Sequence, residues 1–230
     1  EARAEAEILM QVHTQLISPR YGLSIIGCVQ DAISGNYMLT RYMKMSREDA
    51  VELLISARIF DLSRLPKKET VTGKEIFSVV LPQDFNFEGK TRLYSNDEKK
   101  DKANDAVVSI RAGKLLSGAM DKANLGEGSG LMLKNLHQQY GAEQTLEILG
   151  KMFRLGIESL LKYGFTTVIS DTDLPEESRQ RIRKILDEAY ETVDEFIETY
   201  RQGKLDAFPG RTIEETLELR ILERLNIARN

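Results

Sequence analysis

The chain has 230 residues, of which 41% are hydrophobic and 30% charged, and its formal net charge is −4. This length allows one large or two modest domains, and no apolar run approaches the roughly 20 residues that a membrane helix needs, which argues against a membrane protein. The negative net charge argues against a general electrostatic attraction for nucleic acid and leaves only local basic sites for such contacts.

The N-terminal part of the chain is predicted to be helical. Residues 1–15 carry apolar side chains at helical spacing, and this helix is expected to end before Pro19. The first residues are typical of the middle of a solvated helix, so we interpret the chain as an excised fragment. Asp31 is expected to cap a short helix that runs to Arg41, and Ser46 to cap the next helix, because their side-chain oxygens can accept hydrogen bonds from first-turn amides.

The middle of the chain, about residues 66–125, is predicted to contain strands. Apolar residues follow one another at residues 76–81, 107–110 and 115–116, and a proline or a glycine bounds each run. Residues 95–102 are polar and lack periodicity, so we expect a solvated loop or hairpin tip there.

The C-terminal part is predicted to be helical again. Glycines, a proline and a capping box at Thr212 delimit its elements. We expect helices at residues 131–140, 142–163, 175–202 and 212–229, and a brief strand at residues 165–169. The last two helices are joined by a short turn and should pack as an antiparallel pair. The expected fold class is therefore α+β, with a mixed helix and strand domain at residues 1–170 and a helical hairpin at residues 171–230.

Residue types that carry chemistry are few and poorly arranged for catalysis. His13 and His137 lie far apart, and neither has a partner at the spacing of metal ligands. Cys28 lies in an apolar stretch and is expected to be a buried core residue. Residues 72–74 (T-G-K) lack the other residues of a phosphate-binding loop and are interpreted as a turn.

Two further segments allow a functional and a structural interpretation. The glycine-rich residues 126–130 precede a helix, where backbone amides could bind an anion, but a flexible connection explains them more simply. Asp171 and Asp173 could hold a magnesium ion, whereas capping of the helix that follows accounts for them with fewer assumptions. We therefore predict no catalytic residue and no metal-binding residue.

Five blocks of the sequence, taken in order, resemble one family. The first runs from Ile17 through a Q-D pair to a G-x-x-x-L-T arrangement that ends at Thr40. The others are residues 72–82, 116–122, 163–172 and 225–229. Together they are similar to the largest subunit of multisubunit DNA-directed RNA polymerases, and the compactness of the chain favours the archaeal A′ type over the eukaryotic one.

The resemblance implies a place in a large nucleotidyltransferase. Residues 1–170 would be the pore and residues 171–230 the funnel of the secondary channel, through which nucleoside triphosphates enter and backtracked RNA 3′ ends are extruded. The implied partners are the other polymerase subunits and a transcript-cleavage factor at the funnel rim, in the cytoplasm or, for a eukaryotic parent, the nucleus. The family holds its catalytic magnesium with an N-A-D-F-D-G-D motif that this sequence lacks, so we expect the fragment to have no cofactor and no activity of its own.

Five residues match family positions that line or approach the channel. Gln30 and Asp31 match the Q-D pair of the pore, as wall positions or as helix-capping residues. Lys122 matches a pore lysine that could meet RNA or triphosphate, although Ala123 stands where the family often carries a second lysine. Asn226 and Arg229 match the end of the funnel, where Arg229 could bond to a phosphate or to a neighbouring carboxylate.

Two other functions remain as alternatives. An independent adaptor could bind protein partners through the face of a helical hairpin at residues 175–229. An autonomous phosphate-handling enzyme is disfavoured, because the sequence offers no activated nucleophile and no metal cluster. Surfaces that other subunits would cover should promote self-association of the isolated chain.

Overall fold

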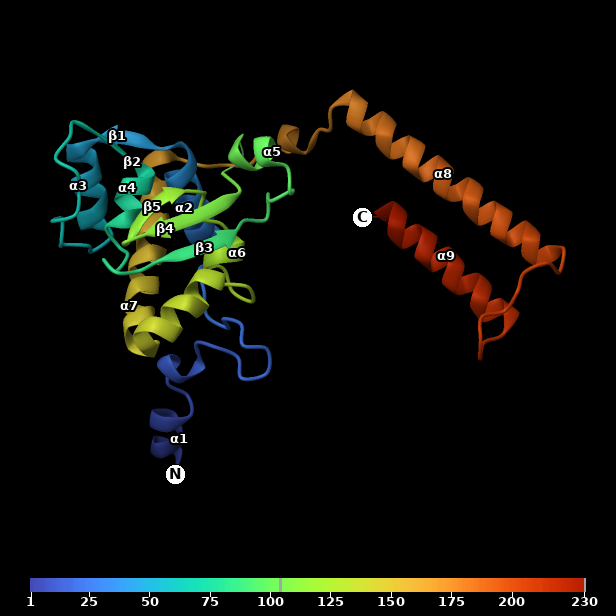
Figure 1. Cartoon of the computed structure of the whole chain (residues 1–230), viewed down its shortest axis with the longest axis horizontal. Coiled ribbons are helices and arrows are strands. Elements are labelled where there is room, and N and C mark those ends of the chain that lie inside the picture. The colour runs from blue at the N-terminus through green and yellow to red at the C-terminus, as the bar shows by residue number, and fades with distance from the viewer. Residues whose placement is uncertain (104, 230) are drawn as a thin grey trace. The chain divides into compact units, whose positions relative to one another are not determined.

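The computed structural model describes residues 1–103 and 105–229, which divide into two compact units, Glu1–Phe165 and Thr166–Asn230. Unit 1 contains α1 (Ala2–Ile8), the 3-10 helix η1 (Val12–Gln15), α2 (Gln30–Tyr42), β1 (Lys44–Ser46), α3 (Arg47–Ser56), β2 (Thr70–Thr72), α4 (Gly73–Ser78), β3 (Phe87–Lys90), α5 (Glu98–Ala103), β4 (Val107–Arg111), β5 (Lys114–Ser117), α6 (Lys122–Leu125) and α7 (Leu131–Tyr163). Unit 2 contains η2 (Ile169–Thr172), α8 (Glu176–Arg201) and α9 (Ile213–Arg229). The predicted α+β fold class is confirmed (Figure 1). Across the described residues, every helix is too short or too polar to cross a bilayer.

Unit 1 is built around the crossing of α2 with α7 (Figure 1). A three-stranded antiparallel sheet has the order β3-β4-β5, and a separate antiparallel ribbon joins β1 to β2. Helix α4 contacts both α2 and the edge strand β5, so it connects the helical layer to the sheet. The two strands predicted at residues 107–110 and 115–116 are confirmed as β4 and β5.

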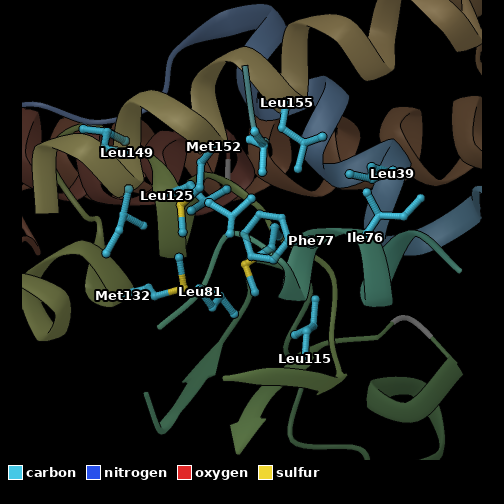
Figure 2. Close-up of a cluster of buried hydrophobic side chains, with 14 of the residues drawn as sticks. Leu39, Ile76, Phe77, Leu81, Leu115, Leu125, Met132, Leu149, Met152 and Leu155 are labelled. Atoms are coloured by element: carbon cyan, nitrogen blue, oxygen red, sulfur yellow. The ribbon is translucent and has the colours of Figure 1, made fainter. Parts of the chain in front are cut away.

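The core of unit 1 draws on elements that are far apart in the sequence (Figure 2). Phe77 of α4, Met152 of α7 and Leu125 of α6 are fully buried and lie in one cluster with Leu39 of α2 and Leu115 of β5. Burial of each such side chain contributes about 1.5–3 kcal/mol before entropy is counted. The cluster therefore fixes α2, α4, α6 and α7 relative to one another.

Glycines allow unusually close backbone contacts in this core. A Cβ atom built on Gly35 of α2 would lie 1.8 Å from the carbonyl oxygen of Gly156 in α7, and one built on Gly73 would lie 1.8 Å from the carbonyl oxygen of Leu39. No side chain fits at such contacts. The glycine of the G-x-x-x-L-T arrangement and the glycine of residues 72–74 therefore serve helix packing.

The apolar run at residues 76–81 is not the predicted strand: residues 76–78 belong to helix α4, and residues 79–81 form a turn and a bend. Thr72 and Glu75 form a capping box that starts α4: the Glu75 amide donates to Thr72 Oγ1, and the Thr72 amide donates to Glu75 Oε2. A short apolar run is compatible with a buried strand or a buried helix, and the cap decides between them. The turn expected at residues 72–74 is the beginning of this helix.

Three other expectations are also wrong. Residues 95–102 include helix α5, which begins where Asp97 Oδ1 accepts hydrogen bonds from the amides of Lys99 and Lys100. The helix expected at residues 1–15 ends at Ile8 and is followed by η1, because its apolar side chains find no packing partner and stay exposed. Residues 165–169 form no strand, and the 3-10 helix η2 starts at the end of this segment.

The predicted C-terminal helices agree with the structure. Gly141, with φ of 76° and ψ of 178°, interrupts α7 as the glycine signal indicated. Pro175 precedes α8, and the predicted capping box starts α9, where the amide of Glu215 donates to Thr212 Oγ1. Helix α9 runs to Arg229, the last described residue.

Unit 2 is an antiparallel pair of helices in which α8 packs along α9 (Figure 1). Ala189 of α8 is buried in this interface. The loop between the helices is held by Thr216, whose hydroxyl accepts a hydrogen bond from the amide of Phe208 at 2.9 Å. Arg220 places its guanidinium 5.3 Å from the centre of the Phe208 ring and 5.9 Å from that of Phe196, a cation–π arrangement. These contacts hold the two helices of the predicted hairpin and the loop between them together.

Candidate functional site

Two segments that are about 100 residues apart in the sequence meet at the start of α2. The amide of Cys28 donates to the carbonyl oxygen of Leu125 at 2.8 Å, and the amide of Gly128 donates to the carbonyl oxygen of Ser24 at 2.8 Å. A Cβ atom on Gly27 would lie 2.6 Å from the backbone of the opposite segment, so only glycine fits there. This junction holds the first turn of α2 beside α6, and residues 126–130 are a packed part of it. The flexible connection expected there is not what the structure has.

Gln30 is the first residue of α2 and has an unusual backbone. Its φ is +44°, a region that side-chain-bearing residues seldom occupy. Its side chain is exposed and forms no hydrogen bond with the described residues. Local backbone strain of this kind is retained only where the surroundings impose it, and it is common at functional sites.

Asp31 does not cap α2, contrary to the expectation from the sequence. The N-cap residue is Val29, and no side chain caps this end of the helix. Asp31 lies in the first turn and is exposed, where its carboxylate interacts favourably with the positive end of the helix dipole. The neighbouring Cys28 is fully buried as predicted, and burial raises the pKa of its thiol to about 12, which makes it unreactive.

Lys122 is the first residue of α6, and Asp121 fixes its backbone. The buried Asp121 carboxylate accepts hydrogen bonds from the amides of Ala123 and Arg92, at 3.1 Å and 2.7 Å, and from the side-chain amide of Asn124 at 3.0 Å. The Lys122 ammonium forms no ion pair with any described residue. A rigid backbone thus presents an uncompensated positive charge.

The structure brings three of the five candidate residues onto adjoining elements. Gln30 and Asp31 begin α2, and Lys122 begins α6, on the two sides of the Cys28 to Gly126 bridge. Asn226 and Arg229 lie in the last turns of α9 in unit 2, and both are exposed. The carboxylate partner considered for Arg229 is not found among the described residues.

Two buried polar residues of α2 that were not among the candidate site residues support the junction from within the core. Asn36 is buried, and its side-chain amide donates to the carbonyl oxygens of Ala32 and Met152, at 2.8 Å and 2.9 Å. The Thr40 hydroxyl donates to the carbonyl oxygen of Asn36 and accepts a hydrogen bond from the amide of Met120. Thr40 belongs to the G-x-x-x-L-T arrangement, which was the only sequence feature that pointed to this network.

The remaining chemical groups are dispersed. Within residues 1–103 and 105–229, no group of three or more His, Cys, Asp or Glu side chains is placed to share a metal ion. Asp171 does not cap α8; it accepts a hydrogen bond from the amide of Val168 within η2. Asp173 lies 3.9 Å from Arg179, so it too has a local structural partner. We derive no metal-dependent step from these residues.

Comparison with known proteins identifies the family to which this chain is similar. A family model described as RNA polymerase Rpb1, domain 3, matches residues 15–172. DNA-directed RNA polymerase subunit Rpo1N of Thermococcus celer is 39% identical over 256 residues, which cover 100% of this chain and 28% of that protein. The same subunit is 39% identical in Methanothermobacter thermautotrophicus and 32% identical in Thermoplasma acidophilum, and each match covers 100% of this chain and 27% of the relative. The chain thus spans little more than a quarter of the length of these relatives.

Proposed function

The chain belongs to the RNA polymerase Rpb1 domain 3 family, with archaeal largest subunits as its relatives, and on this basis we propose that it forms part of the wall of the polymerase's secondary channel. The observation that carries the proposal is that the similarity to Rpo1N runs through the whole chain. In this role unit 1 is the pore and unit 2 the funnel. Nucleotidyl transfer belongs to the assembled enzyme, and the magnesium that it uses is bound by residues outside this chain.

The first turns of α2 and α6 are proposed as the surface that meets RNA or nucleoside triphosphate. Lys122 supplies a positive charge that no described carboxylate neutralises, which suits a phosphate group. Gln30 adds an amide that can donate and accept hydrogen bonds. A single ammonium gives weak, transient binding, as a channel that must release its contents requires.

Crosslinking tests this surface directly. In a polymerase reconstituted with this stretch in its largest subunit, RNA carrying 4-thiouridine at a backtracked 3′ end should crosslink to residues 24–31 or 120–130. Lys122→Glu should weaken the crosslink and shorten the lifetime of the backtracked complex, because the extruded phosphates lose their counter-charge. Lys99→Glu, an equal change on exposed α5, is the matched control. Crosslinks confined to other regions, or equal effects of the two variants, would contradict the proposal.

The outer face of α8 is proposed as the docking surface for a transcript-cleavage factor. The segment from Ile185 to Tyr200 carries six acidic residues and no basic residue. Their spacing of three and four residues places them on one side of the helix, opposite the buried Ala189. They are Asp187, Glu188, Glu191, Asp194, Glu195 and Glu198. Such a stripe attracts a basic protein surface and raises its association rate.

Charge reversal on α8 tests the docking surface. In the assembled polymerase, Glu191→Lys combined with Asp194→Lys should lower the affinity for the cleavage factor and its salt dependence. Reversal of Arg179 and Arg181 to glutamate, at the other end of α8, provides the control. Unchanged binding by the acidic-stripe variant would refute this part of the proposal. The alternative of a free-standing adaptor would gain support only if the hairpin bound partners without polymerase.

A further inference from the structure

A hollow of about 680 Å³ lies on unit 1, and none of the five candidate residues is among the residues that line it. Its walls are the loop at residues 63–66, the start of α4 and the edge strand β5. The polar residues that line it include Arg64, Lys74, Lys114 and Glu75. This volume is within the range of sites that bind small molecules or short peptide segments.

The charges of this hollow are unevenly compensated. Glu75 is paired with Lys68 at 2.8 Å, and Lys74 is paired with Asp105 at 2.8 Å. Arg64 donates instead to the carbonyl oxygens of Leu81 and Gly113. Neither Arg64 nor the exposed Lys114 forms an ion pair with a carboxylate of the described residues. The charge of Arg64 acts on the exposed Asp61 carboxylate, whereas Lys114 has no carboxylate partner among the described residues, so the positive charge at the hollow is only partly compensated.

The backbone fixes the guanidinium of Arg64 and the main chain that carries Lys114. The Arg64 guanidinium spans Leu81 and Gly113, so it ties the turn between β4 and β5 to the end of α4. A Cβ atom on Gly113 would lie 2.1 Å from the carbonyl oxygen of Pro82, which shows how tightly this turn is held. Lys114 follows directly and is presented at the rim. The site is thus preorganised, which lowers the entropic cost of binding.

The apolar part of the hollow limits the class of ligand. Leu116 of β5, with 60% of its surface exposed, lines the hollow together with Pro66 and the buried Leu65. None of the residues that line the hollow is aromatic, so it offers no platform on which a nucleobase could stack. Carboxylates beside an aliphatic side chain complement this surface better than a nucleotide does.

We propose that this hollow binds a short acidic segment of a partner protein. Carboxylates of the segment pair with Arg64 and Lys114, and an aliphatic side chain between them covers Leu116 and Pro66. The hollow shares no lining residue with the first turns of α2 and α6 that are proposed to meet RNA, so either proposal can fail without the other.

Fluorescence anisotropy with the whole chain tests this inference. The probe is a fluorescein-labelled peptide of sequence EELEE, measured at about 50 mM salt, where screening is modest. We expect saturable binding that Lys114→Glu weakens about tenfold, because attraction becomes repulsion at the rim. Lys114→Arg should retain binding. Lys99→Glu, the matched change on α5, should alter it less than about twofold. Amide chemical shifts of Gly113 and Leu116 should move on titration with the peptide.

Several results would overturn the inference. Equal weakening by Lys114→Glu and Lys99→Glu would mean that the peptide responds only to net charge. Displacement of the peptide by inorganic phosphate or by a uridine oligonucleotide at the same concentration would assign the hollow to phosphates. Absence of saturable binding to a folded chain would remove the site altogether.

Discussion

Replacement of Gly35 by alanine tests whether the α2–α7 crossing organises unit 1. The new Cβ atom would lie 1.8 Å from the carbonyl oxygen of Gly156, whereas real Cβ atoms essentially never approach closer than 3.0 Å. The obstacle is backbone, so no side-chain rotation relieves it. The two helices must separate by about 1.2 Å to close that shortfall.

The separation also breaks a buried hydrogen bond. The bond from the Asn36 side chain to the Met152 carbonyl oxygen would lengthen from 2.9 Å to about 4.1 Å, beyond bonding distance. Overpacking costs about 1–3 kcal/mol and an unsatisfied buried amide about 1–3 kcal/mol, against a gain of about 1 kcal/mol from replacing a helical glycine. We expect the free energy of unfolding of unit 1 to fall by about 1–5 kcal/mol.

The only cysteine of the chain provides an assay for unit 1. Cys28 is fully buried, so a thiol reagent reaches it only when unit 1 opens. A loss of about 1–5 kcal/mol should raise the labelling rate about 5- to 4,000-fold, and the urea dependence of that rate distinguishes global opening from local fraying.

A second glycine of α7 is the matched control. A Cβ atom on Gly150 would meet only the mobile end of Arg154, at 3.4 Å, so Gly150→Ala should leave the labelling rate unchanged or lower it. Equal labelling rates for Gly35→Ala and Gly150→Ala would refute the close crossing.

Three further substitutions probe individual interactions. Thr40→Val leaves the buried Met120 amide without its acceptor and should lower the free energy of unfolding, measured by urea denaturation, by about 1–3 kcal/mol. Thr40→Ser should lower it less, and equal urea midpoints for the two variants would contradict this reasoning. Burial raises the pKa of Cys28 from 9.0 to about 12, so its contribution to stability is complete below about pH 9 and is lost as pH rises toward 12. Between about pH 9 and pH 11, the unfolding free energy of Cys28→Ala should therefore decline less steeply than that of the unmodified chain. Parallel curves for the two proteins would argue against the raised pKa of Cys28. A hydrogen bond from Lys162, assisted by one from Ser46, lowers the pKa of the Asp49 carboxyl. The contribution of Asp49 to stability is therefore present above its ordinary pKa of about 3.9 and is lost as pH falls through the lowered pKa. Lys162→Met should return the Asp49 pKa, measured by NMR, toward its ordinary value; an unchanged pKa would exclude the ion pair.

Local signals in the sequence predicted most helices, because caps and glycine stops act within a few residues. The side-chain cap at Ser46, the capping box at Thr212 and the break at Gly141 have local causes and appear in the structure as expected. A local signal could also have prevented the error at residues 76–81, because Thr72 and Glu75 have the spacing of a capping box and so predict the start of a helix. An apolar run of six residues simply outweighed it in the prediction.

The candidate site depends on contacts that no local pattern encodes. The pairing of Cys28 with Gly126 and the hydrogen bond from Met120 to Thr40 join residues about 80 to 100 positions apart. Strands of three residues, such as β1 and β2, likewise owe their existence to one another and not to propensity. The sequence could name Gln30 and Lys122 as candidates through family resemblance, but it could not show that the residue before the N-cap of α2 pairs with the end of α6.

In the first family block, packing within the chain explains the identity of some residues and not of others. Gly35, Leu39 and Thr40 are buried and have intramolecular contacts that explain their identity. Gln30 and Asp31 are exposed and form no side-chain hydrogen bond with the described residues, and Gln30 also retains a backbone conformation that a glycine would adopt at lower cost. Folding of this chain gives no reason for a glutamine at that strained position. We propose that this side chain meets something outside the chain, which makes Gln30 a sharper functional candidate than the buried residues of the block.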